Sequence, residues 1–401
     1  MADRVYDEWA STDEIYASTI KPLVTGVLCG EPGAVIAYGA TGSGKTHTML
    51  GGAEDAGRGG KPGRSASPRR AASAPPAGII PMAVAELFFQ IKTAGEHRAR
   101  DFRIHVSYLE VYQERVYDLL DPSRADVAIR HTPSQGFYPE SREVLCRSVM
   151  DVERLLQQAE ARRRVGGTAA NERSNRSHCV LQVHCHSFDI ASADAEGGTD
   201  GTQDAAADED RRGDEDVSAT LAFVDLAGSE RVARTAASGL RLQEARGINK
   251  SLLALSQLVK ALEKVGRAEE QGGLRPDGHL PYRDAKLTQL LQPSLSGAGR
   301  TVMICCVCLA DLYLEETART LHFARSVRHV QLQPTPVKEE RRAEASSPIL
   351  EEHRQLQRDY VSYPDIRHAH ATLVFSVPGP CLTECLTHTG EVGCGSRGGR
   401  G

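Results

Sequence analysis

The run Gly39-Ala40-Thr41-Gly42-Ser43-Gly44-Lys45-Thr46 constrains this chain more than any other segment. It has the spacing GxxxxGK[ST] and follows the apolar, β-prone residues 34–38. In such a loop the glycines let successive backbone N–H groups point at phosphate oxygens, Lys45 neutralises the β/γ oxygens, and the Thr46 hydroxyl holds Mg²⁺. The run therefore predicts a strand, a phosphate-binding loop and a helix that together grip a nucleotide.

A second nucleotide signal lies far downstream. Residues 221–224 are apolar and predict a buried strand, which runs into Asp225-Leu226-Ala227-Gly228-Ser229-Glu230. An acidic residue at the end of a strand suits Mg²⁺ binding through water, which we assign to Asp225. The N–H of Gly228 can meet a γ-phosphate only when that phosphate is present, so this loop is predicted to act also as a sensor.

A third run, Asn171-Glu172-Arg173-Ser174-Asn175-Arg176-Ser177-His178, follows the helix-like residues 152–164. The three runs, in this order, resemble the phosphate loop, first switch and second switch of the kinesin motor domain. Residues 107–120, 247–255 and 279–288 also resemble kinesin motifs, and the resemblance covers residues 3–330. It implies an α/β P-loop NTPase fold, with a central, mostly parallel twisted sheet and helices on both faces.

The resemblance also implies ATP hydrolysis and assigns roles to residues of the two switches. Ser174 reaches the γ-phosphate and its attacking water, and Arg176 forms a salt bridge with Glu230 that closes the site. Gly228 completes the set that we expect to be catalytic. His47 matches a position beside the adenine, although an ordinary surface histidine of a helix is an equally good interpretation.

Two departures from the family pattern matter. Kinesins usually have serine at position 175, where the hydroxyl helps complete the Mg²⁺ shell, and this chain has Asn175. Its amide oxygen still accepts from a metal-bound water, but the longer side chain changes the geometry, so we expect reduced metal affinity or turnover. The chain also begins after the family's first strand, which carries an Arg-x-Arg-Pro run. We therefore expect an incomplete N-terminal edge of the sheet and half of the adenine pocket to be missing, through truncation or real loss.

Charge and the family pattern together point to the partner. A net charge of −5 and a pI near 6.3 argue against general affinity for nucleic acid. Microtubules are acidic, so a basic contact surface on this chain has to be local. By resemblance it is expected at five residues on or near the helix after the second switch: Arg246, Lys250, Lys260, Arg283 and Lys286.

The remaining composition concerns compartment and metal binding. The chain has ten cysteines, and Cys305, Cys306 and Cys308 lie in the apolar run 301–309, so we expect buried, reduced thiols. Cys381, Cys385, His388 and Cys394 do not match a common zinc spacing. Neither a signal peptide nor an apolar run of membrane length is evident, which predicts a cytoplasmic, cytoskeletal protein that does not bind membranes.

The chain divides into a motor domain over residues 1–330, a neck-linker-like segment over 331–337 and a tail over 338–401. Low-complexity inserts at 51–77 and 190–217 interrupt the motor. The tail is charged, then Gly-rich, and is expected to be mostly disordered; it lacks the apolar heptads of a coiled coil, so dimerisation is not supported.

Within the kinesins, residues 110–116 and 239–244 resemble chromokinesin-like members. Two alternatives to a working motor stay open: a non-catalytic microtubule-binding pseudo-motor and a truncated motor fragment. A GTPase switch fits poorly, because the chain has no guanine-reading Asn-Lys-x-Asp run.

Overall fold

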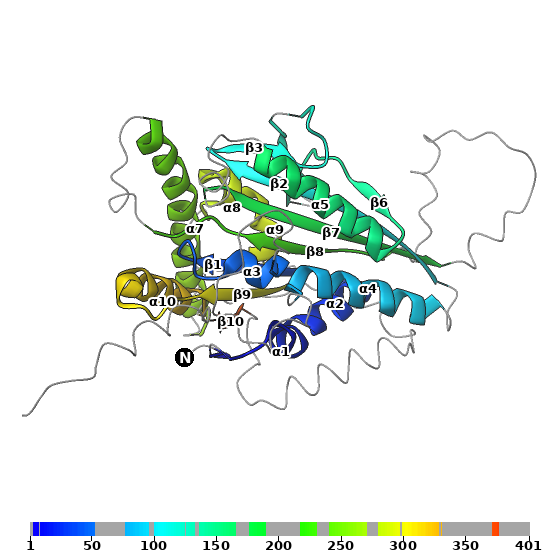
Figure 1. Ribbon diagram of the computed structural model, residues 1–401, viewed down its shortest axis with the longest axis horizontal. Coiled ribbons are helices and arrows are strands. Elements are labelled where there is room, and N and C mark those ends of the chain that lie inside the picture. Colours follow the sequence, from blue (N-terminus) through cyan, green and yellow to red (C-terminus); the bar gives the residue numbers. More distant parts are fainter. Residues whose placement is uncertain are drawn as a thin grey trace, which may run out of the picture.

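The predicted strand before the phosphate loop is β1 (Gly33–Gly39), and it lies inside an eight-stranded sheet. This computed structural model describes the following residues: 3–7, 9–52, 77–95, 100–124, 126–132, 136–165, 176–189, 217–230, 240–270, 280–296, 299–328, 330 and 371–376. The strand order is β10-β9-β1-β8-β7-β2-β3, with β6 also paired to β2, and Figure 1 shows these strands side by side.

The strands other than β1 have these bounds: β2 Arg100–Tyr112, β3 Arg115–Asp118, β4 Ile129–Thr132, β5 Gly136–Pro139, β6 Val144–Cys146, β7 His178–Asp189, β8 Val217–Asp225, β9 Arg300–Cys306 and β10 Ala371–Ser376. The helices are α1 Thr12–Ile15, η1 Tyr16–Ile20, α2 Lys21–Leu28, α3 Lys45–Leu50, α4 Ile79–Gly95, α5 Val149–Val165, α7 Leu240–Glu270, η6 Tyr282–Asp284, α8 Lys286–Leu290, α9 Gln292–Leu295, η7 Asp311–Tyr313 and α10 Leu314–Arg328.

The sheet is mixed, so the expectation of a mostly parallel sheet is wrong. Pairings β10–β9, β9–β1 and β1–β8 are parallel, whereas β8–β7, β7–β2, β2–β3 and β2–β6 are antiparallel. The reason lies in the connections. Strands β2 and β3 are joined by a two-residue turn, and β7 and β8 pair as the two arms of a hairpin that carries the second insert, and hairpin connections produce antiparallel neighbours.

Both faces of the sheet are covered, as the resemblance implied. Alternate residues of β1 point to opposite faces: Val35 and Ala37 pack in the core with α2, α4 and α5, whereas Ile36 and Tyr38 pack in the core with α7, α8 and α10. On the second face the Tyr38 and Phe323 rings stack with centroids 4.1 Å apart. The seven residues of β1 are all buried, which explains their continuous apolar sequence.

Each of the two low-complexity inserts begins and ends at residues that pair with each other in the core. Gly51 and Ala77 form an isolated antiparallel bridge, so the two ends of the first insert meet. Ser187 pairs with Val217 where β7 ends and β8 begins, which places the second insert at a hairpin tip. Most residues of both inserts, the neck-linker-like segment and the cysteine-bearing end of the tail lie outside the described residues.

The tail contains a strand that the sequence did not predict. Strand β10 (Ala371–Ser376) pairs with β9 and forms the edge of the sheet. The sheet was expected to be incomplete at its N-terminal edge; in the structure a segment from the other end of the chain lies beyond β9.

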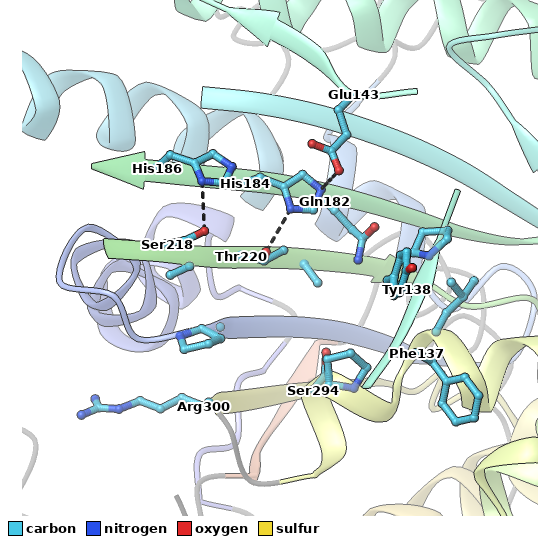
Figure 2. Close-up of a pocket in the computed structure, with 18 residues that line it drawn as sticks. Phe137, Tyr138, Glu143, Gln182, His184, His186, Ser218, Thr220, Ser294 and Arg300 are labelled. Carbon is cyan, nitrogen blue, oxygen red and sulfur yellow. Dashed lines mark hydrogen bonds and ion pairs between the residues drawn. The ribbon is translucent and has the colours of Figure 1, made fainter. Parts of the chain in front are cut away.

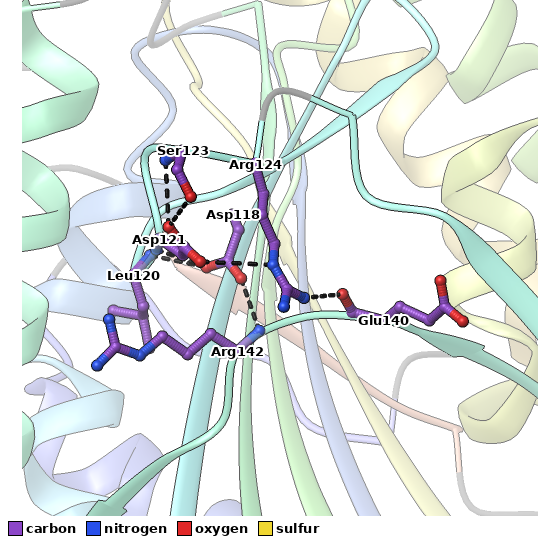
Figure 3. A network of polar contacts seen from close by, with 7 residues as sticks. All are labelled: Asp118, Leu120, Asp121, Ser123, Arg124, Glu140 and Arg142. Carbon is purple, nitrogen blue, oxygen red and sulfur yellow. Dashed lines mark hydrogen bonds and ion pairs between the residues drawn. The ribbon is translucent and has the colours of Figure 1, made fainter.

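The β4–β5 hairpin is fastened to the end of β3 by the buried Asp118 carboxylate and by an Arg124–Glu140 hydrogen bond (Figure 3). Asp118 is 3% exposed and accepts hydrogen bonds from the N–H groups of Leu120 (2.8 Å), Asp121 (3.1 Å) and Arg142 (2.7 Å). Arg124 donates from Nη1 to the carbonyl of Glu140 at 2.7 Å. These contacts fix both ends of the segment that carries the hairpin.

The cysteines of the described core are free thiols, as expected. Cys305 and Cys306 are fully buried, and burial raises the pKa of the Cys305 thiol. Over the parts of the chain that the structure describes, we find no helix with both the length and the apolar character to cross a membrane.

Candidate nucleotide site

The phosphate loop joins β1 to α3, as predicted. Gly39 ends β1 and Lys45 begins α3, and Gly42 and Gly44 adopt positive φ angles of 80° and 101°. Gly39 lies close to β9: a Cβ built on it would lie 2.2 Å from the carbonyl oxygen of Cys306. Only glycine fits there, because the obstacle is backbone of the neighbouring strand.

Lys45 is folded back onto its own loop. Its ammonium Nζ donates to the carbonyls of Gly39 (3.0 Å) and Ala40 (2.8 Å), and the residue is 7% exposed. Burial lowers the pKa of Lys45, and nearby Asp225 opposes that shift. The charge is thus held at the mouth of the loop by weak neutral acceptors, which phosphate oxygens would outcompete.

Thr46 and Asp225 come together although they are far apart in sequence. The Thr46 hydroxyl donates to Asp225 Oδ2 at 2.6 Å, which joins the start of α3 to the end of β8. Burial raises the pKa of Asp225, opposed by this hydrogen bond and by Lys45.

A cation would fit these oxygens. Among the described residues, buried Asp225 Oδ1 and Ser43 Oγ have no hydrogen-bond partner. A hydroxyl, a carboxylate and unsatisfied oxygens are the ligand types that Mg²⁺ takes, directly or through water. The residues therefore suit the metal that the sequence predicts. The other predicted metal residue, Asn175, lies outside the described residues, as does Ser174.

Glu230 contacts the phosphate loop. Its carboxylate accepts from the Thr41 N–H (2.9 Å) and from the Thr41 hydroxyl (2.5 Å). A Cβ on Gly228 would lie 2.2 Å from that hydroxyl, so the 225–230 loop closes tightly on the phosphate loop. Arg176 is half-buried just before β7, and its predicted salt bridge with Glu230 stays a prediction.

His178 is a site residue that sequence reasoning missed. Its Nδ1 accepts from the Ala227 N–H at 3.0 Å, so its proton is on Nε2, which lies 2.7 Å from the Ser251 hydroxyl of α7. Burial lowers the pKa of His178 to about 3, with Lys45 and Arg163 adding to the shift. The histidine thus remains neutral and links β7, the 225–230 loop and α7. Its place at the end of the first-switch run was the available signal.

His47 lies exposed on α3, a position compatible with both interpretations of its role. The predicted basic residues fall on adjacent elements. Lys250 and Lys260 are exposed on α7, which contacts η6 and α8. Arg283 on η6 is exposed with its guanidinium 5.9 Å from the centroid of the Phe137 ring, and Lys286 begins α8. Arg246 is on α7, but its side chain lies outside the described residues.

A second pocket, of about 590 Å³, lies at the opposite ends of the strands, near Gly33 of β1 and Arg300 of β9 (Figure 2). His184 is hydrogen-bonded through Nδ1 to the Thr220 hydroxyl (3.0 Å), and its Nε2 lies 3.7 Å from Glu143. Burial lowers the pKa of His184. This pocket contains none of the predicted nucleotide-site residues.

Comparisons with known proteins agree on one family. The family model for the kinesin motor domain matches residues 1–330. The chain is 36% identical over 323 residues to the kinesin-like protein KIN-7L of Oryza sativa subsp. japonica, covering 80% of this chain and 43% of that protein. It is 35% identical over 340 residues to the chromosome-associated kinesin KIF4 of Xenopus laevis, covering 83% and 24%.

A solved structure described as a fast kinesin matches with a TM-score of 0.67 and 31% identity, covering 86% of this chain and 83% of that one. The near-equal identities to KIN-7L and KIF4 do not separate subfamilies. The chain spans less than half the length of these two relatives. Kinesin motor domains as a family bind nucleotide, hydrolyse ATP and bind microtubules. With its phosphate loop and second-switch loop in contact, this chain belongs to the kinesin motor-domain family.

Proposed function

We propose that this chain is an ATP-dependent microtubule motor domain, which hydrolyses ATP with Mg²⁺ and couples closure of its switch loops to microtubule binding and movement. The observation that carries the proposal is the contact between two distant loops. Thr46 meets Asp225 at 2.6 Å, and Thr41 meets Glu230 at 2.9 Å. These contacts join the predicted phosphate loop to the loop that we expect to sense the γ-phosphate, which supports coupling between the two.

The residues divide the work of phosphoryl transfer, which needs positioning and charge stabilisation. Lys45 would leave the carbonyls of Gly39 and Ala40 for the β- and γ-phosphate oxygens. Thr46 and Asp225 would hold Mg²⁺, which when bound neutralises charge on the transferred group. Ser174 would position the attacking water, Gly228 would contact the γ-phosphate, and Asn175 would complete the metal shell through water.

Switch closure requires Glu230 to exchange partners. In this structure its carboxylate is held by Thr41, and we infer that it exchanges this contact for Arg176 when the site closes. His178 extends the coupling to the far side of the sheet. Because it bonds both Ala227 and Ser251, a shift of the 225–230 loop is passed to α7. The exposed face of α7 carries Lys250 and Lys260, which suit an acidic filament.

Microtubule binding is tested by co-sedimentation of the full chain at low ionic strength. We expect Lys250→Glu and Lys260→Glu, tested singly, each to weaken microtubule affinity about three- to tenfold through like-charge repulsion. Lys92→Glu is the matched control, because Lys92 is an exposed lysine of α4, on the other face of the sheet. Equal effects at all three positions would assign the binding to net charge and contradict an α7 contact surface.

A further inference from the structure

Strand β9 has the properties of a strand that needs neighbours on both edges. Its residues from Val302 to Cys306 are 0–2% exposed, and their sequence is a continuous apolar run. Such sequences are typical of strands inside a sheet, whereas exposed edges carry charges, prolines or bulges. Strand β1 occupies only one edge of β9.

The other edge of β9 is taken by the tail. Strand β10 runs parallel to β9 over its whole length, from Ala371 opposite Thr301 to Ser376 opposite Cys306. Helix α10 contacts β1, β9 and β10, so one helix covers all three strands. The sequence of β10, Ala-Thr-Leu-Val-Phe-Ser, consists largely of residues that favour strands.

The strand register places the end of β10 near the phosphate loop. Gly39, Cys306 and Ser376 form one row across β1, β9 and β10. Two strand spacings separate Gly39 from Ser376, or about 10 Å. Since Gly39 contacts the carbonyl of Cys306, the position of the loop depends on β9, and β9 is held in turn by its outer neighbour.

We propose that residues 371–376 are an integral strand of the motor sheet, docked on the open edge of β9 by the same chain. The tail segment thereby pairs with the outer edge of β9, which is otherwise exposed. It also stabilises β9, the strand that Gly39 of the phosphate loop packs against. This strand pairing is a property of the sheet and holds whether or not the chain hydrolyses ATP.

The segment that pairs with the outer edge of β9 comes from the same chain. Residues 331–370 connect Val330 to Ala371, and fully extended they would span roughly 130 Å, which is more than enough to cross a single domain. Because the strand is tethered to the sheet, its effective local concentration can reach the millimolar range. A separate chain would have to be that concentrated to compete for the same edge. A second copy could place the same strand in trans, and the experiment distinguishes the two arrangements.

Disulfide trapping in the full chain tests the pairing and its register. Ser376→Cys places a thiol opposite Cys306, at the separation of adjacent strands, which is within disulfide range. Thr372→Cys is the matched control, because four strand residues, or about 13 Å, separate it from that row. Each variant is oxidised in a glutathione buffer, and cross-linked peptides are identified by mass spectrometry.

We expect Ser376→Cys to form an intramolecular disulfide with Cys306 and Thr372→Cys to form none with it. No cross-link at position 376 in a folded variant, or equal yields at both positions, would overturn the register. A cross-linked dimer on non-reducing gels would overturn docking by the same chain.

Proline substitution gives a second, independent measurement. In a parallel pair the N–H groups of alternate residues point to the same neighbour, so one of Leu373→Pro and Val374→Pro removes a hydrogen bond to β9. We expect that variant to show a thermal unfolding midpoint lowered by several degrees, with a smaller shift in the other. Midpoints unchanged in both variants would mean that β10 contributes nothing to the sheet.

Discussion

At the scale of single residues, the buried histidine His178 is the most informative group. It accepts from the Ala227 N–H and lies 2.7 Å from the Ser251 hydroxyl, so protonation on Nδ1 would remove a backbone hydrogen bond and bury a charge. Burial accordingly lowers its pKa to about 3, far below that of an exposed histidine near 6.5.

This shift predicts acid sensitivity. Above pH 6.5 the histidine is neutral in both states; below pH 6.5 the unfolded chain takes up the proton first, so the free energy of unfolding falls until the pH nears 3. At pH 5.5 the loss is about 1.4 kcal/mol. Urea unfolding at pH 7.5 and 5.5 should show that the wild type loses about 1.4 kcal/mol more than His178→Gln between the two pH values.

The control for this effect is His131→Gln, because His131 is exposed on β4. It should keep the pH dependence of the wild type. If His178→Gln and the wild type lost equal stability between the two pH values, the neutral, linking role of His178 would be wrong.

The phosphate loop could be predicted from the sequence, but the long-range hydrogen bonds around it could not. The phosphate loop was predictable because its geometry is local, set by glycines and Lys45 within eight residues. The Thr41–Glu230 and His178–Ala227 hydrogen bonds join residues far apart in the chain, and no local pattern specifies them. Buried polar partners of this kind depend on the sheet register, which only the structure supplies.

At the scale of elements, the β4–β5 hairpin depends on one carboxylate (Figure 3). Asp118 satisfies three backbone N–H groups, on both sides of the hairpin, from a position that is 3% exposed. The hairpin in turn contacts α8, whose first N–H bonds Glu114 at 3.1 Å. Asp118 thus helps place a segment next to the proposed microtubule surface.

We predict that Asp118→Asn lowers the free energy of unfolding by about 1–3 kcal/mol, because an amide nitrogen cannot accept and leaves a buried N–H unpaired. Chemical denaturation measures the loss. Asp121→Asn is the matched control: its carboxylate is more exposed and bonds Ser123, so its effect should be smaller. A larger loss in the control would contradict the anchoring role of Asp118.

Elements with strong periodicity or long apolar runs were predicted well. The helix expected at 152–164 is α5, Val149–Val165, and the strand expected at 301–309 is β9, Arg300–Cys306. Strand β10 was missed because six strand-favouring residues in a biased tail are too short a run to predict a strand without the neighbour that they pair with. Their conformation follows from an edge of β9 that only the folded sheet presents.

At the scale of the whole molecule, the sheet lies between the predicted nucleotide site and the proposed filament surface and links the two. The carboxyl ends of β1 and β8 carry the predicted nucleotide-site residues, and the face under α7, α8 and α10 carries the proposed filament surface. The order of the motifs identified the family, but the mixed strand directions and the tail strand required the structure. A motor needs both parts to respond to one ligand, which a binding module does not.

The most direct test is the steady-state ATPase rate of the full chain with and without polymerised microtubules. We predict strong microtubule stimulation, a loss of about a hundredfold or more in Lys45→Ala, and no change in the control Lys92→Ala. Stimulation that survives Lys45→Ala, or a folded wild type that binds microtubules without hydrolysing ATP, would contradict the motor and leave a non-catalytic microtubule-binding protein.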